Sequence, residues 1–500
     1  MKSIFAIAWL SIFMIPLTLW PTQANRPPIG TLDVITDFIV EGWSLDPDIP
    51  SQSIDVHFYV DGPYPQGTLA GSVTTNILRE DVNKALKVTG LHGFRWFIPW
   101  QFRDGQPHSL YAYGIDPLVP GVQGLLNQSP KEFRVAPPPS IPSNGQPYNI
   151  GAWYFTAWSP ANEFHTVNAE RVYGRRDWWG GVRDHALGAD PWGLKMDYSN
   201  REPLLGFYNL LEQDVMDAHI RQAASRGLSF FAFYWYWNTD VNQEDGLSTP
   251  MRTFISSSLK SRIKFLIAPI KLGKSPMTLG MWKNSVVPFM VGKYISDPSY
   301  LKTVDERPIV ILFNLGFPNV PDMVNAIDFL RDYVIKQTGR NPVLLWLYWA
   351  QSVDDLVWGK LHLKIDGYAC FHLMPSKPAE PYTQTLSGWT SYISKQQGFF
   401  HIPCASTGFD SRPWYKVGWD SRGVNEREYN TDITIPAFAD HLRTVKDYLD
   451  AHPIETSKTL IVYAWNEQGE TVGLEPNRVD KYQYLDTIKN VFGLSNVNTF

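Results

Sequence analysis

The stretch TLIVYAWNEQGE, residues 459–470, starts as an apolar run and stops abruptly on polar side chains. Its first six residues have the composition of a buried β-strand. Two carboxylates, Glu467 and Glu470, follow the run and stand three residues apart. In a barrel of parallel strands, the residues just past the carboxyl end of each strand form the active site. The stretch therefore predicts a buried strand that ends at a pair of functional acid groups; a strand that ends in a solvated acidic loop is the alternative.

Eight runs of this kind occur after residue 148, and segments of helical pattern separate them. The predicted strands are residues 150–155, 228–236, 263–270, 308–313, 343–349, 366–372, 399–405 and 459–465. Helices are predicted at residues 214–226, 323–337 and 437–451. Near-continuous apolar strands that alternate with helices indicate a parallel sheet that is covered on both faces.

This alternation predicts an α/β fold, a (β/α)8 TIM-type barrel with insertions, over residues 148–500. A doubly wound open sheet is the alternative. Such a sheet often carries a glycine-rich phosphate-binding fingerprint, and the chain has none. We therefore expect the barrel.

Residues 25–136 have a different sequence pattern, in which turns separate short β-forming runs. The clearest runs are residues 37–43, 54–60, 93–99 and 108–114. The second of them alternates with a period of two, as a strand with one buried face does. Short strands at this spacing predict an N-terminal all-β sandwich domain. The Pro-rich segment 137–147 that follows is predicted to be a stiff linker.

The first 24 residues have the features of a signal peptide. Lys2 supplies a positive start, residues 4–20 are mostly apolar, and Thr22-Gln23-Ala24 is a small-x-small cleavage site. An uncleaved anchor is the alternative, but the run is short for a membrane span and contains Pro16. We therefore expect a secreted or periplasmic chain that begins at Asn25 and has no stable membrane insertion.

The composition narrows the classes of partner. A net charge of -5 and a pI near 6.1 provide no basic surface for nucleic acid. The chain has no glycine-rich nucleotide loop and no Cys/His spacing typical of zinc, so we expect no cofactor and no metal. Its two cysteines, Cys370 and Cys404, fall on neighbouring predicted strands. They form either one disulfide or two buried thiols.

If the barrel closes, the residues that follow its strands share one mouth. The two predicted catalytic residues are Glu467 and Glu470, and the predicted substrate-binding residues are Tyr154, Trp158, Tyr234, Tyr236, Trp237, His372, Asp410, Arg412, Trp465 and Asn466. Such a mouth is rich in aromatic rings and hydroxyls and poor in cations. Aromatic faces suit the apolar face of a sugar ring. A carboxylate pair suits glycosidic bond cleavage, because one group protonates the leaving oxygen and the other activates a nucleophile.

Each of these residues also has a structural alternative. Tyrosine and tryptophan at strand ends can be packing residues, and a lone histidine such as His372 is more often structural than catalytic. Asp410 and Arg412 can form a structural ion pair. The convergence of several such residues favours a polysaccharide or glycan as substrate, with no nucleotide.

The segment Tyr463-Ala464-Trp465-Asn466-Glu467-Gln468-Gly469-Glu470, with Leu474-Glu475-Pro476 after it, resembles the terminal motif of family 99 glycoside hydrolases and their WbsX-like relatives. Shorter pieces resemble that group as well, at residues 152–155, 206–208, 227–237, 307–310 and 408–414. The resemblance runs from about residue 148 to residue 476 and leaves out the predicted sandwich.

The resemblance implies a secreted (β/α)8 retaining α-glycosidase, which in the narrow family is an endo-α-mannosidase. By motif position, Glu467 would assist the sugar's own 2-hydroxyl as nucleophile, through a 1,2-anhydro sugar, and Glu470 would be the general acid/base. The chain departs from the family pattern at Gln468, where an aromatic residue is common, and at Thr471, where glycine is common.

Two other functions fit parts of the sequence. A glycosyltransferase of polysaccharide assembly is one, but the predicted signal peptide and the lack of a nucleotide-sugar cradle argue against it. A carbohydrate-binding protein without catalysis is the other, and the presence of both Glu467 and Glu470 argues against a decayed site.

Overall fold

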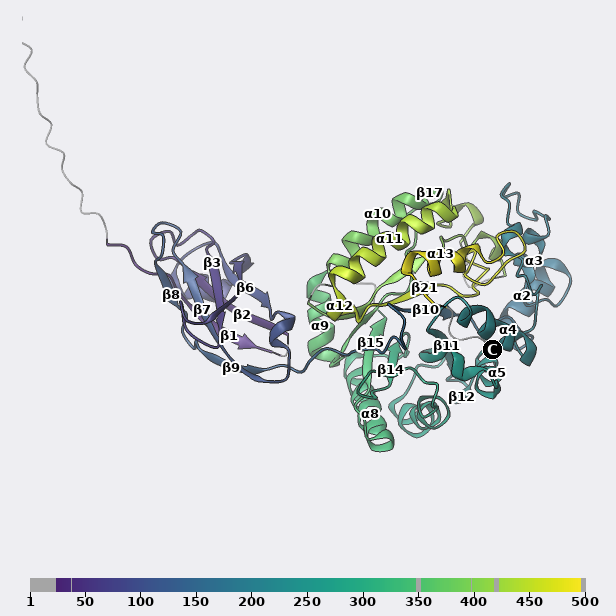
Figure 1. Ribbon diagram of the computed structural model, residues 1–500, viewed down its shortest axis with the longest axis horizontal. Coiled ribbons are helices and arrows are strands. Elements are labelled where there is room, and N and C mark those ends of the chain that lie inside the picture. The colour runs from purple at the N-terminus through teal and green to yellow at the C-terminus, as the bar shows by residue number, and fades with distance from the viewer. Residues whose placement is uncertain (1–23, 37, 348–351, 397, 418–421, 496–500) are drawn as a thin grey trace, which may run out of the picture. The chain divides into compact units, whose positions relative to one another are not determined.

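The computed structural model describes residues 24–36, 38–347, 352–396, 398–417 and 422–495. The chain divides into two compact units between Pro137 and Pro138 (Figure 1). The predicted signal peptide, apart from residue 24, lies outside the described residues, as do residue 37 of the first predicted run and residues 348 and 349 of the fifth predicted barrel strand. Within the described ranges, no helix is long and apolar enough to cross a membrane.

The N-terminal unit contains two antiparallel sheets. In the first the order is β1 (Ile29–Ile35), β2 (Ile39–Leu45), β6 (Leu91–Phe97) and β5 (Ile77–Leu78). In the second it is β4 (Thr68–Thr74), β3 (Asp55–Val60), β7 (Pro107–Ile115) and β8 (Gln123–Leu125), and β9 (Lys131–Arg134) also pairs with β7. Side chains of both sheets share one apolar core, in which Phe58 stacks on Trp96 with ring centroids 4.2 Å apart.

The sequence predicts an all-β domain here, but the unit also contains a helix. A short helix, α1 (Glu80–Leu86), lies between β5 and β6. Two acidic residues, Glu80 and Asp81, occupy its first turn, where the helix dipole favours negative charge. Lys87 closes the helix in the left-handed conformation. The helix is marked only by these residues at its ends, so a search for the two-residue periodicity of strands does not find it.

The second unit contains parallel strands at all eight predicted positions. One sheet holds β13 (Lys264–Leu272), β11 (Phe230–Asn238), β10 (Asn149–Tyr154), β21 (Thr459–Tyr463) and β19 (Cys404–Ser406), with β12 (Gln243–Glu244) antiparallel to the end of β11. The other holds β14 (Ile309–Leu312), β15 (Val343–Leu347), β16 (Gly367–Ala369) and β18 (Phe400–Ile402). The strands are almost wholly buried, as strands covered on both faces are.

The two parallel sheets meet at both of their edges. The predicted strand at residues 399–405 is two strands, β18 and β19, because Pro403 between them has no N–H for the ladder. β18 belongs to one sheet and β19 to the other. At the opposite edges a parallel bridge joins Ile270 to Asn314, and the Lys271 N–H donates to the Asn314 carbonyl at 2.7 Å.

Helices surround these strands (Figure 1). They are α2 (Glu163–Tyr173), α3 (Gly180–Ala186), α4 (Gln213–Ala224), α5 (Pro250–Ser256), α6 (Leu279–Met281), α7 (Val287–Met290), α8 (Val320–Thr338), α9 (Val353–Leu363), α10 (Tyr382–Ser394), α11 (Ile435–Ala451), α12 (Pro453–Thr456) and α13 (Gln483–Phe492); a small pair, β17 (Glu380–Pro381) and β20 (Asn430–Thr431), lies outside the main sheets. α4, α8 and α11 are the three helices predicted from sequence. The side chain of Asn319 caps α8 and that of Thr434 caps α11, which sets where these helices begin.

Cys370 and Cys404 form a disulfide, with Cα atoms 5.1 Å apart. Cys370 follows β16, and Cys404 begins β19, so the bond joins residues of the two parallel sheets. Of the two states left open by the sequence, the structure has the bonded one.

Part of the Pro-rich segment is attached to the second unit. The Ile141 N–H donates to Ser457 Oγ at 2.7 Å, and the Ile141 carbonyl accepts from Asn149 Nδ2 at 3.0 Å. The Ser140 carbonyl accepts from the Val304 N–H at 2.7 Å, and the Ile141 side chain is buried. The first half of this segment therefore belongs to the packing of the second unit.

We expect a fragment of residues 138–500 to unfold cooperatively and to be more stable than a fragment of residues 148–500. The shorter fragment loses the burial of Ile141, worth about 1.5–3 kcal/mol, together with these hydrogen bonds. Differential scanning calorimetry of the two fragments measures the difference, with the full chain as reference. Equal melting temperatures would show that the segment is only a linker, and an insoluble 138–500 fragment would show that the two units share a core.

Candidate functional site

The loop after β21 folds back on itself and carries the two glutamates. The Leu474 N–H donates to the Ala464 carbonyl at 2.9 Å, and the Glu475 N–H donates to the Trp465 carbonyl at 2.8 Å. Between these contacts the Glu470 N–H donates to the Glu467 carbonyl at 2.9 Å. The carboxylates therefore lie on a closed, tight loop at the carboxyl ends of parallel strands, where α/β folds bind ligands.

Gly469 stands between the two glutamates for a steric reason. A Cβ atom at this position would lie 1.9 Å from the indole ring of Trp414. Only glycine lets the loop backbone approach that ring.

Tyrosine hydroxyls hold both carboxyl groups. The Tyr234 hydroxyl donates to Glu467 Oε2 at 3.1 Å, and the Tyr463 hydroxyl donates to Glu470 Oε2 at 2.5 Å. Glu467 is only 6% exposed, whereas Glu470 is half-buried. Burial raises the pKa of Glu467 well above its usual value, the charge of Glu470 raises it further, and contacts with the Tyr234 and Tyr463 hydroxyls oppose the rise.

Tyr236 is the third phenol near the acid pair. Tyr234 and Tyr236 are two residues apart on β11, so their side chains leave the strand on the same face. Burial raises the pKa of Tyr236 well above its usual value, with further contributions from the charges of Glu467, Asp245 and Glu470. The phenol is therefore a neutral hydrogen-bond donor at physiological pH.

His372 packs against the same group of rings. Its ring centroid lies 4.3 Å from that of Tyr463, and it stacks on Phe409 at 5.2 Å. Burial lowers the pKa of His372 to about 4. The imidazole is therefore neutral at pH 7, where it offers polarity and a flat ring and no charge.

Asp410 and Arg412 form a buried ion pair next to the loop. Arg412 Nε donates to Asp410 Oδ1 at 2.8 Å, and Nη2 donates to Oδ2 at 2.7 Å. The Tyr198 hydroxyl donates to Asp410 Oδ2 at 2.8 Å. The Asp410 N–H also donates to the carbonyl of Glu470 at 2.6 Å, so the residue that forms this ion pair also holds the backbone of the loop. This is the structural alternative named for these two residues.

Trp158 and Asn466 hold the backbone of the loop. The Asn466 side chain bonds both the N–H and the carbonyl of Phe155, at 2.8 and 2.9 Å. Trp158 Nε1 donates to the Asn466 carbonyl at 2.5 Å, and its ring stacks on Trp179 with centroids 3.8 Å apart. Both side chains are fully buried, so they join the ends of β10 and β21.

Three other predicted residues do not join the acid pair. Tyr154 bonds His219 Nδ1 at 2.7 Å, and the Trp465 ring meets His219 edge-on at 5.6 Å, in the layer next to α4. Trp237 packs against Phe289, with centroids 5.7 Å apart. Side chains alternate along a strand, so Trp237 leaves β11 on the face opposite to Tyr236.

Sequence reasoning missed residues that the structure brings to the site. Tyr463, the last residue of β21, contacts both acid groups. Trp153 stacks beside Tyr234 at 5.5 Å. Period-two alternation could have identified Trp153, which stands one position before the predicted Tyr154 and so leaves β10 on the other face. Tyr463 stands two positions before the predicted Trp465, and alternation does not separate these two. His219, on α4, had no local signal.

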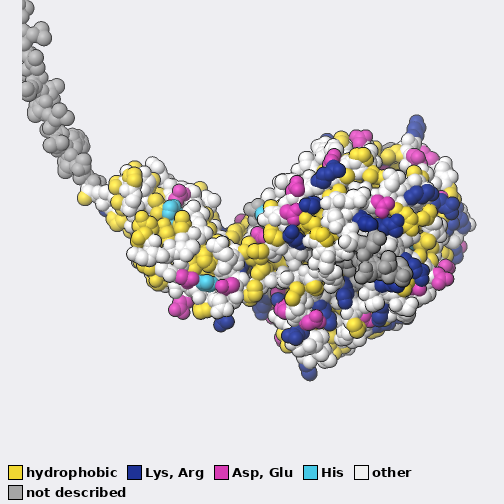
Figure 2. All heavy atoms as spheres, viewed as in Figure 1, with side chains coloured by type: hydrophobic (Ala, Val, Ile, Leu, Met, Phe, Trp, Pro, Cys, Tyr) yellow, Lys and Arg dark blue, Asp and Glu magenta, His cyan; other side chains and the backbone are white. Residues whose placement is uncertain are grey.

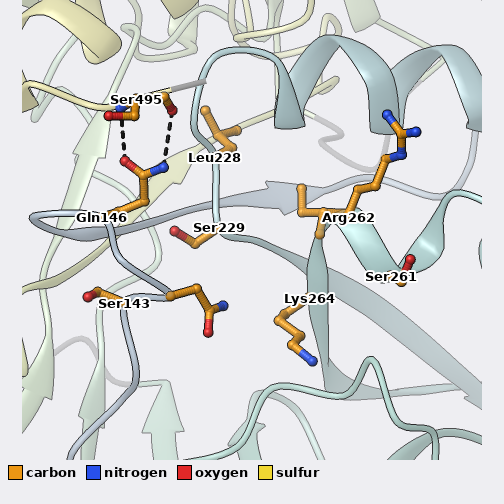
Figure 3. Close-up of a pocket in the computed structure, with 10 residues that line it drawn as sticks. Ser143, Gln146, Leu228, Ser229, Ser261, Arg262, Lys264 and Ser495 are labelled. Carbon is orange, nitrogen blue, oxygen red and sulfur yellow. Dashed lines mark hydrogen bonds between the residues drawn. The ribbon is translucent and has the colours of Figure 1, made fainter. Parts of the chain in front are cut away.

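A separate hollow lies at the opposite end of the strands (Figure 3). It has a volume of about 510 Å³ and is lined mainly by hydroxyl and amide side chains near the start of β11 and β13. Its two cationic side chains, Arg262 and Lys264, point to different sides, and Gln146 bonds the backbone of Ser495 at 2.9 and 3.1 Å. No carboxylate is among the lining residues, so this hollow does not offer the pair of acid groups found after β21.

The surface charges visible in Figure 2 are of mixed sign. On the face shown in Figure 2, Lys and Arg side chains of the second unit are interspersed with Asp and Glu. Over the residues that the structure describes, no group of three His, Cys, Asp or Glu side chains is placed to hold a metal ion.

No family model matches the chain. Solved structures similar to it include the GH99 endo-alpha-mannosidase from Bacteroides thetaiotaomicron, with a TM-score of 0.43 and 13% identity over 69% of this chain and 95% of that one. A glycoside hydrolase-like protein has a TM-score of 0.44 and 14% identity over 71% of this chain and 97% of that one. The catalytic domain of a family GH18 chitinase from the fern Peteris ryukyuensis has a TM-score of 0.34 and 11% identity over 53% and 91%. At TM-scores below 0.5, these similarities do not identify the family of this chain.

We expect Glu467→Gln to raise the melting temperature at neutral pH. The unfolded carboxyl loses its proton near its usual pKa of 4.5, whereas the folded one holds the proton to higher pH. The wild type therefore loses stability as pH rises through this window, and the amide does not. The advantage of the variant should be absent near pH 4 and reach about 2 °C or more at pH 8.

Glu380→Gln is the matched control, because that buried carboxyl has the opposite shift. Burial raises the pKa of Glu380, but hydrogen bonds from Ser376 and Thr385 outweigh burial and hold it below the usual value. Its replacement should destabilise the protein more at pH 8 than at pH 4. The same pH trend in both variants would contradict the raised pKa of Glu467.

Trp237→Ala should act on stability. Truncating a buried tryptophan costs roughly 3–5 kcal/mol, and Trp237 is buried against Phe289. Thermal unfolding should show a large fall in melting temperature, and Trp237→Phe should keep most of the stability. An unchanged melting temperature combined with weaker binding of long glycans would instead assign Trp237 to substrate contact.

Proposed function

We propose that this chain is a glycoside hydrolase that cleaves α-glycosidic bonds of a polysaccharide or glycan, with Glu467 and Glu470 as its catalytic pair. One observation carries the proposal. Two carboxylates lie on one closed loop at the carboxyl ends of parallel strands, both contact the Tyr463 hydroxyl, and burial raises the pKa of one of them. Two carboxyl groups with environments that set their pKa values apart are the requirement for acid/base cleavage of a glycoside.

We also propose that these parallel strands, with β18 and β19 counted together as the seventh, form a (β/α)8 barrel. The consecutive strands β18 and β19 belong to different sheets, and the Ile270–Asn314 bridge joins the other two edges. These two connections support closure. Closure would bring the carboxyl ends of all eight strands to one mouth around Glu467 and Glu470.

The proposed mechanism follows from the motif's resemblance to family 99 and proceeds with retention. Glu467 takes the proton of the sugar's 2-hydroxyl as that oxygen attacks the anomeric carbon, and Glu470 gives its proton to the departing glycosidic oxygen. A 1,2-anhydro sugar results. Water then attacks the anomeric carbon and yields a proton to Glu470, while Glu467 returns its proton to the 2-oxygen. Two inversions leave the original configuration.

The environments of the two glutamates suit these roles. A general base works best when its pKa lies near the working pH, and burial moves the pKa of Glu467 upward. Glu470 is the more exposed of the two, as a group that must meet both leaving group and water should be. In the reactive state Glu467 and Glu470 together carry one proton. That proton must be on Glu470, because Glu470 is the acid and Glu467 is the base.

The resemblance makes α-mannosides, cleaved in the endo mode, the first substrates to test. We propose that the enzyme acts outside the cytoplasm, on the basis of the predicted signal peptide. A screen of α-mannans, α-glucans and other glycans, with released sugars analysed by size, identifies the substrate.

Glu470→Gln tests the roles with aryl α-mannosides of different leaving groups. Loss of the general acid should reduce the rate by roughly a hundredfold or more when the leaving group is poor. The loss should be much smaller when the leaving group needs no proton. Glu467→Gln should be severe for both, because it acts on the nucleophile. Glu306→Gln, at an exposed carboxyl, is the control.

Equal losses for both leaving groups in Glu470→Gln would contradict the acid assignment. The reverse pattern in the two variants would exchange the roles of the glutamates. No release of sugar from any of the α-glycosides by the wild type would overturn the proposed function.

A further inference from the structure

A buried polar cluster lies behind the loop that carries the acid pair. At its centre is the carboxylate of Glu475, which is 1% exposed. Its Oε2 accepts from the Tyr208 hydroxyl at 2.8 Å and from Gln468 Nε2 at 2.7 Å. His219 Nε2 lies 2.9 Å from its Oε1. A buried carboxylate needs such partners, because an unpaired one is very costly.

Tyr154 fixes the tautomer of His219. Burial and the charge of Glu475 raise the pKa of Tyr154 well above its usual value, so its hydroxyl stays protonated. That hydroxyl lies 2.7 Å from His219 Nδ1, and the Glu475 carboxylate beside Nε2 can only accept, so Nδ1 accepts from the hydroxyl in the neutral ring. In the neutral imidazole the hydrogen is then on Nε2, which donates to Glu475. Three donors therefore converge on one buried carboxylate.

Gln468 connects this cluster to the acid pair. It is one of the two residues between Glu467 and Glu470, and it is fully buried. Its side chain donates to Glu475, and its carbonyl accepts from Arg201 Nη1 at 2.6 Å. The same residue is thus held by a buried anion through its side chain and by a buried cation through its backbone.

The Arg201 contact extends to the next loop. Arg201 Nη2 donates to the Asp410 carbonyl at 3.2 Å, and the Asp410 N–H donates to the Glu470 carbonyl. Burial lowers the pKa of Arg201 from its high usual value, and the nearby charge of Asp410 opposes this. The loop is therefore fixed on two sides, by Glu475 through the side chain of Gln468 and by Arg201 through the carbonyls of Gln468 and Asp410.

We propose that Gln468 and Glu475 are positioning residues for Glu467 and Glu470. The buried carboxylate of Glu475 holds the loop through the Gln468 amide, and the loop in turn keeps Glu467 buried against Tyr234 and Glu470 against Tyr463. The observed contacts are the argument for the positioning of the two acid groups. The expected effect on catalysis also rests on the proposed function.

Gln468→Leu is the decisive variant, because leucine is similar in size and cannot donate to Glu475. Burial is the main cause of the raised pKa of Glu467, so a loosened loop that admits water should lower that pKa toward 4.5. The full chain labelled with carbon-13 at the glutamate carboxyl measures this by NMR titration, and Glu467→Gln assigns the signal. Gln396→Leu, at another buried glutamine beyond the end of α10, should leave the titration unchanged.

Kinetics on an aryl α-mannoside with a poor leaving group provide the second readout. We expect kcat/KM to fall about tenfold or more, since a small misplacement of reacting groups has effects of this size. The rise of kcat/KM with pH, which follows deprotonation of Glu467, should also shift to lower pH in Gln468→Leu. A loss of stability alone would change neither the pH at which kcat/KM rises nor the pKa of Glu467 measured by NMR.

Glu475→Gln changes the other partner of the hydrogen bond between Gln468 and Glu475. It replaces Gln468→Leu as the test variant if Gln468→Leu does not fold. The neighbouring charge that raises the pKa of Glu467 is Glu470, so a shift in this variant reports movement of the loop. Wild-type titration of Glu467 in the variants, with a lower melting temperature, would overturn the proposal and leave a structural role. If no α-glycoside is cleaved by the wild type, the proposed function fails, and the NMR titration still decides the positioning.

Discussion

The site depends on the cost of burying a carboxyl group. Glu467 is removed from water at the end of a sheet, where its charged form is disfavoured. The fold offsets this cost with phenol donors and with a loop that closes by backbone hydrogen bonds, whereas the charge of Glu470 adds to it. The same burial that weakens the folded state raises the pKa of the group, as is common for acid groups at functional sites.

Strand alternation divides the aromatic residues into two sets with different tasks. Trp153, Tyr234 and Tyr236 leave β10 and β11 on the face of the acid pair, and Tyr154 and Trp237 leave on the other face. The first set supplies hydroxyls and flat rings to the site. The second packs against helices or other rings and holds the strands in place. An aromatic-rich run such as residues 230–237 therefore contributes side chains both to the surroundings of the acid pair and to the packing behind the strand.

The loop between β21 and α13 is supported in layers. Asn466 and Trp158 attach it to β10, Trp414 packs against its glycine, and the cluster around Glu475 holds its far side. Each contact satisfies a polar group or fills a space that would otherwise be costly.

Local sequence patterns determined the strands, three of the helices and the place of the acid pair. Apolar runs, helical periodicity and the polar stop after residue 464 are properties of contiguous residues, so they can be read without the fold. The tertiary structure alone decided the rest. His219 and Glu475 stand 256 positions apart, and the bonded state of Cys370 and Cys404 also needed their proximity. Such contacts depend on how the chain folds over long distances, because no local pattern states which distant side chains will meet or which face of a strand a given ring will occupy.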